Sequence, residues 1–219
     1  MSGLSFEVLG ARAEPHAAVP TLVLRLRLTD AGAPPDDAPV HALALRCQIM
    51  IEPQHRRYEP AEQARLVDLF GDTPRWGETL RPFLWTHVGT VVTGFTEATE
   101  IDLPITCTYD FEVAAAKYLH GLDDGEVPLL LLFSGTVFRA ARSSAGFAAG
   151  PVAWHEEARF RLPVRVWRDV MDRYFPNAGW VRMSRETLDA LTRFRSARAL
   201  PTWDETFEQL LKQAGEEGS

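Results

Sequence analysis

The side chains with the clearest potential for chemistry are histidines and acids near the ends of predicted strands. His155 and Glu157 are two residues apart, and alternate residues of a strand point to the same face, so these side chains can converge. Together with a further histidine such as His120, they could hold a metal ion. His41 and His87 also stand near strand ends. An exposed polar strand start and scattered surface histidines explain the same residues, and we expect that simpler arrangement.

The candidate nucleophiles are Ser134 and the two cysteines, Cys47 and Cys107. Ser134 lies inside the most apolar run of the chain and precedes Gly135, which is typical of a tight packing point or a β-bulge. Each cysteine lies on the apolar side of an alternating run, where burial raises the pKa of a thiol and lowers its reactivity. We therefore predict two inert, reduced thiols, with no catalytic residue, metal site or cofactor.

Basic and aromatic residues near the C-terminus suggest a different kind of site. Arginines are dense there, and two tryptophans flank them: Arg182, Arg185, Arg193, Arg195, Arg198, Trp180 and Trp203. The opposing acids, Glu186 and Asp189, are fewer. Because a planar guanidinium pairs with carboxylates and stacks on aromatic rings, this composition is typical of protein interfaces. We predict that these seven residues bind a partner protein. The alternative is salt bridges on a helix surface, with the tryptophans in the core.

The totals of the sequence limit the classes of function. Its 219 residues carry a formal net charge of −7, which argues against a general nucleic-acid-binding protein. The first residues, MSGLSFEVLG, lack a basic region followed by an apolar one, and no apolar run approaches the roughly 18 residues of a membrane span. We therefore expect a cytoplasmic protein. The sequence contains no G-x-S-x-G, glycine-rich phosphate loop, H-E-x-x-H or paired C-x-x-C motif.

The most apolar run, VPLLLLFSGTVF at residues 127–138, is the segment around which the predicted fold is organised. It lacks helical periodicity, follows the turn sequence DDG at 123–125, and ends in a loop rich in Ala, Ser and Gly. Such a run predicts a strand buried on both faces, which needs a further layer on each side.

Alternating apolar and polar residues predict the other strands, at 6–12, 21–29, 41–51, 86–95, 101–113 and 152–162. The strands at 21–29 and 41–51 have the pattern of an antiparallel hairpin with a long tip. Pro104 cannot donate to a ladder, so its strand lies at a sheet edge or begins pairing after it. Residues 113–122 continue that strand or form a helix, and the last strand has Trp154 on its inward side. A helix is predicted near 60–70, with Pro60 in its first turn and Gly71 as its stop.

From residue 163 the apolar spacing changes to three and four residues, which predicts helices. The first stops at Pro176, the second begins after Ser184, and Thr202 with Glu205 has the form of a capping box for the third. Strands followed by helices predict an α+β fold with an antiparallel β-sandwich-like body over residues 1–162. We expect a C-terminal layer of about three helices over 163–214, packed on the body as one domain, and a tail at 215–219.

Several stretches together resemble one protein family. They are HALALRCQIMIEPQ at 41–54, RRY at 56–58, RLVDLFGDTPRWGETL at 65–80, CTYDFEVAAAKYLHGLDDGEVPLLLLFSGTVF at 107–138, RLPVRVWRDVMDRYFPN at 161–177 and ALPTWD at 199–204. This family is uncharacterised, mainly actinobacterial, and often encoded near genes for high-affinity uptake nickel–iron hydrogenases. The resemblance implies participation in that pathway and assigns no catalytic residue. Because a nickel–iron or iron–sulfur centre normally takes four thiolates, two cysteines imply an accessory role rather than an electron-carrying one.

We therefore expect a non-enzymatic accessory or assembly protein that binds a partner protein. The resemblance implies a hydrogenase subunit or a maturation factor as that partner. One alternative is a small-ligand-binding β-sandwich, which would show an apolar cavity with few polar groups. The other is an enzyme of unrecognised type, which would show titratable groups clustered at the strand rim around His155, Glu157 or His120.

Overall fold

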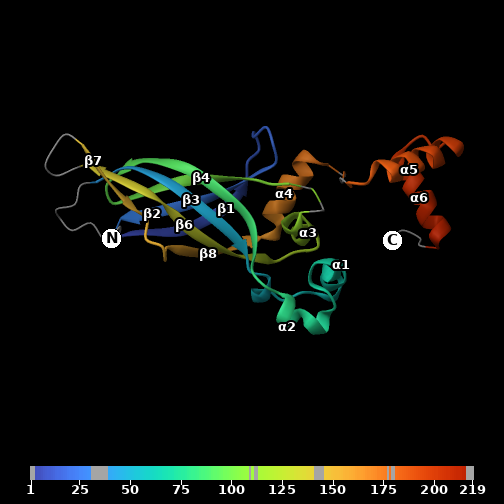
Figure 1. Ribbon diagram of the computed structural model, residues 1–219, viewed down its shortest axis with the longest axis horizontal. Helices are drawn as coiled ribbons and strands as arrows, with labels where there is room; N and C mark the ends of the chain where they lie inside the picture. Colours follow the sequence, from blue (N-terminus) through green and yellow to red (C-terminus); the bar gives the residue numbers. More distant parts are fainter. Residues whose placement is uncertain are drawn as a thin grey trace. The chain divides into compact units, whose positions relative to one another are not determined.

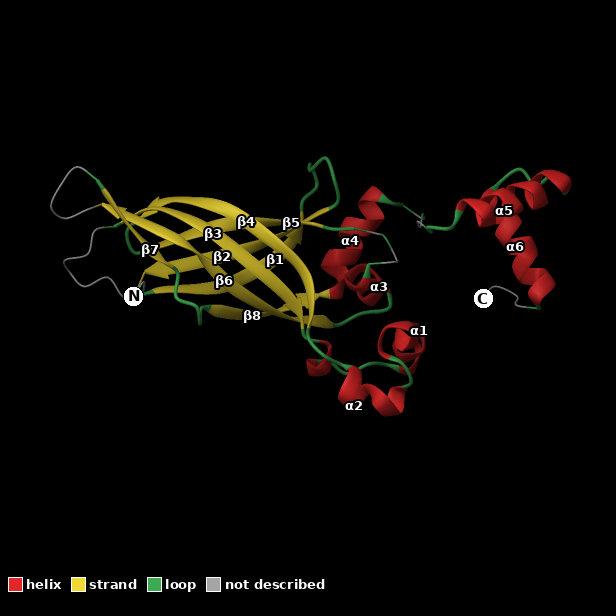
Figure 2. Ribbon diagram, in the orientation of Figure 1, coloured by secondary structure: helices red, strands yellow, loops and turns green. Residues whose placement is uncertain are grey.

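Two antiparallel β-sheets face each other in the first part of the chain (Figure 1). A computed structural model describes residues 3–30, 39–108, 110, 113–140, 146–176, 178 and 181–215. The chain divides into two compact units, residues 1–180 and 181–219, and the first unit, called the body below, contains both sheets. Figure 2 shows the strands gathered in the sandwich and the helices outside it, with α4, α5 and α6 after the last strand of the chain, and the predicted α+β class is confirmed.

Sheet A has three strands in the order β1, β2, β5. Their bounds are Leu4–Ala13 for β1, Thr21–Asp30 for β2 and Ala98–Thr106 for β5. The leucines at alternate positions of β2 are fully buried: Leu22, Leu24, Leu26 and Leu28. The arginines between them point outward, as the period of two predicts. Pro104 is on β5, an edge strand of this sheet, and lies opposite Val23 of β2. An edge position is expected for a residue that has no backbone N–H to donate.

Sheet B has five strands, with β4, β3 and β6 side by side. Their bounds are Phe83–Phe95 for β4, Val40–Ile51 for β3, Glu126–Ala140 for β6, Phe147–Pro151 for β7 and Glu157–Pro163 for β8. β7 and β8 share the remaining edge of β6, β8 pairing with its first half and β7 with its second. Between them, residues 152–156 leave the sheet, while the N–H of Val152 donates to the carbonyl of Gly135 at 3.0 Å.

The predicted hairpin of residues 21–29 and 41–51 is wrong, because the two strands belong to different sheets. β2 pairs with β1 and β5, whereas β3 pairs with β4 and β6. Both strands alternate apolar and polar residues because each of two facing sheets presents one apolar row to a shared interior. Alternation fixes which face of a strand is buried. It does not fix which strand lies beside it.

The prediction that residues 127–138 are buried on both faces is also wrong. Odd-numbered residues of β6 point inward and are buried: Val127, Leu129, Leu131, Phe133 and Val137. The even-numbered Leu130 and Leu132 lie on the outer face and are only half-buried. Trp154 is not inward either, since it sits in the excursion between β7 and β8 with 93% of its surface exposed. Sheet A covers the inner face of β6, whereas the leucines on its outer face remain in contact with solvent.

The helices of the body lie at one end of the sandwich (Figure 1). They are α1 (Pro60–Phe70), α2 (Trp76–Thr79), α3 (Ala114–His120) and α4 (Val164–Tyr174), with short 3-10 turns at Pro53–His55 and Thr73–Arg75. α1 begins with Pro60 and ends before Gly71, whose φ is 72°, as predicted. α4 buries Trp167, Val170 and Met171 along one face. No helix in the described ranges has the length and apolar content that crossing a membrane requires.

The second unit contains α5 (Arg185–Ala197) and α6 (Trp203–Ala214). Their predicted N-caps are confirmed, since the Ser184 hydroxyl accepts from the N–H of Thr187 at 3.1 Å and the Thr202 hydroxyl accepts from Glu205 at 3.2 Å. The unit begins at residue 181, so α4 belongs to the body and α5 and α6 form a group of their own. Packing of these two helices on the body stays a prediction.

Candidate protein-binding surfaces

The outer face of sheet A is covered by ion pairs between neighbouring strands. We call this set the sheet A face: Glu7, Arg12, Arg25, Arg27, Glu100 and Asp102. Arg27 lies opposite Glu7 on one side and opposite Glu100 on the other, and its guanidinium is 2.9 Å from the Glu100 carboxylate. Arg25 lies opposite Asp102, with 3.1 Å between their charged atoms, and Arg12 also reaches Asp102 at 3.0 Å. Directly opposite charges of unlike sign stabilise an antiparallel pair.

These pairs shift the titration of the acids on the sheet A face. The hydrogen bond from Arg27 lowers the pKa of Glu100 below its ordinary value, with a further contribution from Arg25. Similarly, the hydrogen bond from Arg25 lowers the pKa of Asp102, assisted by Arg12. These carboxylates therefore remain ionised at pH values that protonate ordinary surface acids, and they stay paired with the arginines of the sheet A face.

The outer face of sheet B carries more exposed apolar side chains than the outer face of sheet A does. We call the following exposed or half-buried side chains the sheet B face: Ala44, Arg46, Gln48, Met50, Leu84, His87, Val91, Leu130 and Leu132. Their register makes rows across the strands, because Met50 lies between Leu84 and Leu130. Val91 is 74% exposed and Leu84 is 44% exposed. Val91 lies opposite Ala44, six residues along β3 from the Leu84–Met50–Leu130 row, and the rows of Gln48 and Arg46 lie between them. Exposed apolar groups on one face of a sheet are candidates for an interaction surface.

The few charges around the sheet B face are mostly positive. Arg46 lies in its middle, and Arg161 lies on the adjoining outward side of β8; neither forms an ion pair within the described residues. Arg159 and Glu157, also on β8, pair with each other at 2.8 Å. A surface with unpaired cations on a chain of net charge −7 is electrostatically complementary to an acidic partner.

Trp154 adds an exposed aromatic ring at the edge of sheet B. The chain presents it between β7 and β8, where β6 carries Ser134 and Gly135. Its indole contacts the neighbouring His155 edge-on, with 5.6 Å between the ring centroids, and 93% of the residue stays exposed. Tryptophan is the residue type most enriched among side chains that dominate binding energy, so this exposure is a second sign of a protein contact.

The predicted arginine and aromatic residues gather on the second unit. Arg195 places its Cζ 4.4 Å from the centre of the Trp203 ring, which joins α5 to α6 next to the turn between them. Arg198 lies 3.8 Å from the centre of the Phe194 ring. Within the described residues none of the five arginines forms an ion pair, so helix-surface salt bridges do not account for them. Trp180 lies outside the described residues.

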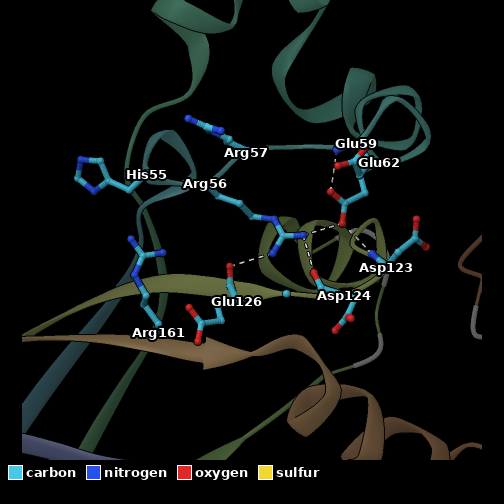
Figure 3. A pocket seen from close by; sticks show the side chains of 10 residues that line it. His55, Arg56, Arg57, Glu59, Glu62, Asp123, Asp124, Glu126 and Arg161 are labelled. Carbon is cyan, nitrogen blue, oxygen red and sulfur yellow. Dashed lines mark hydrogen bonds and ion pairs between the residues drawn. The ribbon is translucent and has the colours of Figure 1, made fainter.

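A cleft near the body's helices has a charged rather than an apolar lining (Figure 3). It measures about 650 Å³ and is lined by His55, Arg56, Arg57, Glu59, Glu62, Asp123, Asp124, Gly125, Glu126 and Arg161. Arg56 and Glu62 form its floor as an ion pair of 2.6 Å, with side chains only 9% and 3% exposed. This lining differs from the apolar cavity that a small-ligand-binding sandwich would show.

The buried pair in the cleft holds the turn before β6 against α1. Arg56 donates to the carbonyl of Glu126 at 2.8 Å and to that of Asp124 at 2.6 Å, while Glu62 accepts from the N–H of Asp123 at 2.9 Å. Glu62 also accepts from the N–H of Glu59 at 3.1 Å, at the start of the helix. A buried charge needs this degree of pairing, so the central groups of the cleft are already occupied by structural contacts.

The structure does not bring the rim histidines and acids together. His155 lies 3.6 Å from Glu156, whereas Glu157 pairs with Arg159. His41 and His87 stand at different heights, because His87 lies opposite Gln48, seven residues along β3 from His41, which is about 23 Å of strand. His120 is on α3, where burial lowers its pKa. No group of three or more metal-binding side chains occurs within the described ranges.

The candidate nucleophiles lie in settings that the sequence predicted. Cys47 and Cys107 are buried and free, and burial raises the pKa of each thiol to about 12, so neither forms a thiolate at neutral pH. Ser134 is exposed on the outer face of β6 beside Gly135, whose φ is 152°. A Cβ at Gly135 would lie 2.1 Å from the Ala44 carbonyl, which makes this the tight packing point expected from the sequence.

Sequence reasoning missed the sheet B face, although its signal was present. The leucine run of β6 carries apolar residues at even as well as odd positions. A buried strand and a strand with an apolar outer face produce the same run, and only the number of layers in the structure distinguishes them.

The comparisons with known proteins establish a family. The model of a family of unknown function, DUF6084, matches residues 1–219. The chain belongs to this family. No curated protein matches it. Membership of DUF6084 brings no activity and no site with it, so the surfaces described above carry the functional argument.

Two solved structures show weak likeness to this DUF6084 chain. The β-glucosidase 3B from Thermotoga neapolitana in complex with glycerol is 14% identical over 73% of this chain and 17% of its own, with a TM-score of 0.26. The same enzyme in complex with α-D-glucose is 17% identical over 74% of this chain and 17% of its own, with a TM-score of 0.25. The chain thus spans a small part of that enzyme, and likeness at this level carries no argument about function.

Proposed function

We propose that this protein is a non-enzymatic accessory or assembly protein that binds a partner protein through the sheet B face. The observation that carries the proposal is the outer side of β6. Leu130 and Leu132 remain half-buried there, and Met50 joins Leu130 to the exposed Leu84 in one apolar row across three strands. A partner laid on this face covers that row and removes its apolar surface from water.

The chemistry of the face defines the partner. Apolar side chains of a partner would pack on the apolar row, and carboxylates would pair with Arg46 and Arg161. Trp154 at the edge calls for a pocket that accepts an indole ring. We therefore expect the partner to present an apolar surface bordered by Asp and Glu. The resemblance to a family encoded beside uptake-hydrogenase genes makes a hydrogenase subunit or a maturation factor the first partner to test.

The experiment is affinity purification of the tagged protein from its native host at low salt, followed by mass spectrometry. Three forms are compared: the natural chain, the double variant Leu84→Glu/Val91→Glu, and the control Ser5→Glu. Ser5 is exposed on β1, so the control adds charge to sheet A instead. We expect the natural chain and the control to recover the same partner, and the double variant to lose it.

Two results contradict the proposal. One is a natural chain that is recovered without a specific companion. The other is a partner that the double variant retains as well as the natural chain does, which places the contact elsewhere on the molecule. Recovery of a hydrogenase subunit or maturation factor by the natural chain supports the specific partner, and recovery of a different acidic protein refutes that part alone.

A further inference from the structure

The second unit is small and has almost no interior of its own. It comprises residues 181–219, which is close to the roughly 40 residues below which a chain seldom folds without metals, disulfides or association. α5 buries no residue, and α6 buries Thr206 alone among its described side chains. Large apolar residues stay exposed on both helices, since Leu188 is 42%, Phe207 39% and Leu211 44% exposed.

The charged residues on the two sides of the turn between α5 and α6 are opposite in sign. The end of α5 and the residue after it carry Arg193, Arg195 and Arg198. The start of α6 carries Asp204, Glu205 and Glu208. The two groups flank the same turn, yet none of these six residues forms an ion pair within the described residues.

The acidic group on α6 has an apolar centre. Asp204, Phe207, Glu208 and Leu211 are spaced by three, four and seven residues, so they lie on one face of the helix. The helix pair therefore carries cations on one side of the turn, and anions around exposed apolar residues on the other side, and these two groups can complement those of a second copy. Two-fold symmetry uses two such groups directly, because residue i of one copy then meets residue j of the other, and j meets i.

We propose that the helix pair joins a second copy of this chain, with the arginines at the end of α5 facing the acids at the start of α6 of the other copy. Phe207 and Leu211 pack in the centre of the contact, and the charge pairs surround them. This contact is separate from the sheet B face and does not depend on the proposed partner.

A charge-exchange experiment on the full chain tests this proposal. Sedimentation velocity is measured for the natural chain, for Arg193→Glu/Arg198→Glu, and for Asp204→Lys/Glu208→Lys. Arg195 is left in place because its guanidinium stacks on Trp203 and so joins α5 to α6, whereas Arg198 stacks on Phe194 of the helix that it follows. The natural chain should sediment as a dimer whose dissociation constant rises with salt. Each variant should dissociate at least about tenfold more readily, because like charges then oppose each other. An equimolar mixture of the two variants should restore the dimer.

The matched control is Arg185→Glu, which changes the same charge at the opposite end of α5 and should leave the dimer intact. Restoration in the mixture also shows that the variants fold. A monomeric natural chain overturns the proposal, as does a mixture of the variants that stays monomeric, or a control that dissociates as readily as Arg193→Glu/Arg198→Glu. The Leu84→Glu/Val91→Glu variant should remain a dimer, so failure here and failure of the sheet B proposal are told apart.

Discussion

The two sheets of the body have similar interiors and contrasting exteriors. Both direct rows of Leu, Ile and Val toward the shared core, but sheet A covers its outer face with the Arg25, Arg27, Glu100 and Asp102 pairs. Sheet B leaves Val91 and its apolar neighbours uncovered. An antiparallel sheet commonly leaves one face to solvent, and that face is then polar. Sheet A meets this condition along its ion pairs, whereas the outer face of sheet B exposes Leu84 and Val91 to solvent.

Exposed ion pairs contribute little to stability, typically about 0–1 kcal/mol each. The ladder on sheet A therefore matters more for what it prevents than for what it stabilises, since a charged face resists association with other apolar surfaces. By the same reasoning, the absence of such a ladder from sheet B permits association there.

The largest effect on stability should come from a charge that belongs to neither outer face. Glu62→Gln leaves the buried Arg56 guanidinium without its counter-ion, so the free energy of unfolding should fall by about 3–5 kcal/mol in urea denaturation. The control is Asp68→Asn, which removes the exposed pair with Lys117 and should cost less than about 1 kcal/mol. Equal costs for the two substitutions would show that the Arg56–Glu62 pair does not hold the turn before β6.

The next largest effect concerns binding at the edge of sheet B. Trp154→Ala should weaken binding of the captured partner by about 2–4 kcal/mol, because an exposed tryptophan anchors an interface once it is buried there. The melting temperature should hardly change, since the indole packs on little of the body. Val19→Ala, at another exposed apolar residue, serves as the control in the same calorimetric titration. Unchanged affinity for Trp154→Ala would remove this ring from the interface.

A smaller effect should distinguish the faces by their response to acid. The pKa values of Glu100 and Asp102 are lowered in the folded state. Their contribution to folding stability is therefore fully present above the pKa values of the unfolded chain, and it is lost as pH falls through the pKa values of the folded chain. Glu100→Gln/Asp102→Asn should therefore flatten the dependence of the melting temperature on pH below about 4.5. Leu84→Thr on sheet B should leave that dependence unchanged. A double variant that keeps the natural profile would contradict the role of the ladder.

The smallest effect should come from removing apolar surface on the sheet B face. Val91→Thr keeps a β-branched side chain at an exposed position, so the free energy of unfolding should change by no more than about 0.5 kcal/mol. A loss of more than 2 kcal/mol in urea denaturation would mean that Val91 packs within the body and is not available to a partner.

Local patterns predicted individual elements well and their neighbours poorly. The alternating leucines of β2, the edge position of Pro104 and the caps at Ser184 and Thr202 depend on residues close in sequence, and the structure confirms them. The pairing of β2 with β3 was wrong because period two is common to every strand of a sandwich. The outer face of β6 was misjudged for a related reason, since counting layers requires knowing what packs against each sheet.

The partner-binding residues that the sequence predicts near the C-terminus stay a prediction, and the sequence did not predict the sheet B face. Arginine and aromatic composition pointed to a protein contact on α5 and α6, and the structure joins Arg195 to Trp203 there. Nothing in the spacing of Leu84, Met50 and Leu130 marks them as one row, because strand register brings together residues from distant parts of the sequence.

The most direct measurement is site-specific photo-crosslinking in the native host. A photoreactive amino acid is placed at position 91 on sheet B or at position 5 on sheet A, and the adducts are identified by mass spectrometry. We expect position 91 to capture one partner protein and position 5 to capture none. An adduct at position 5 with none at position 91, or no adduct at either, would contradict the claim that the outer face of sheet B binds a partner.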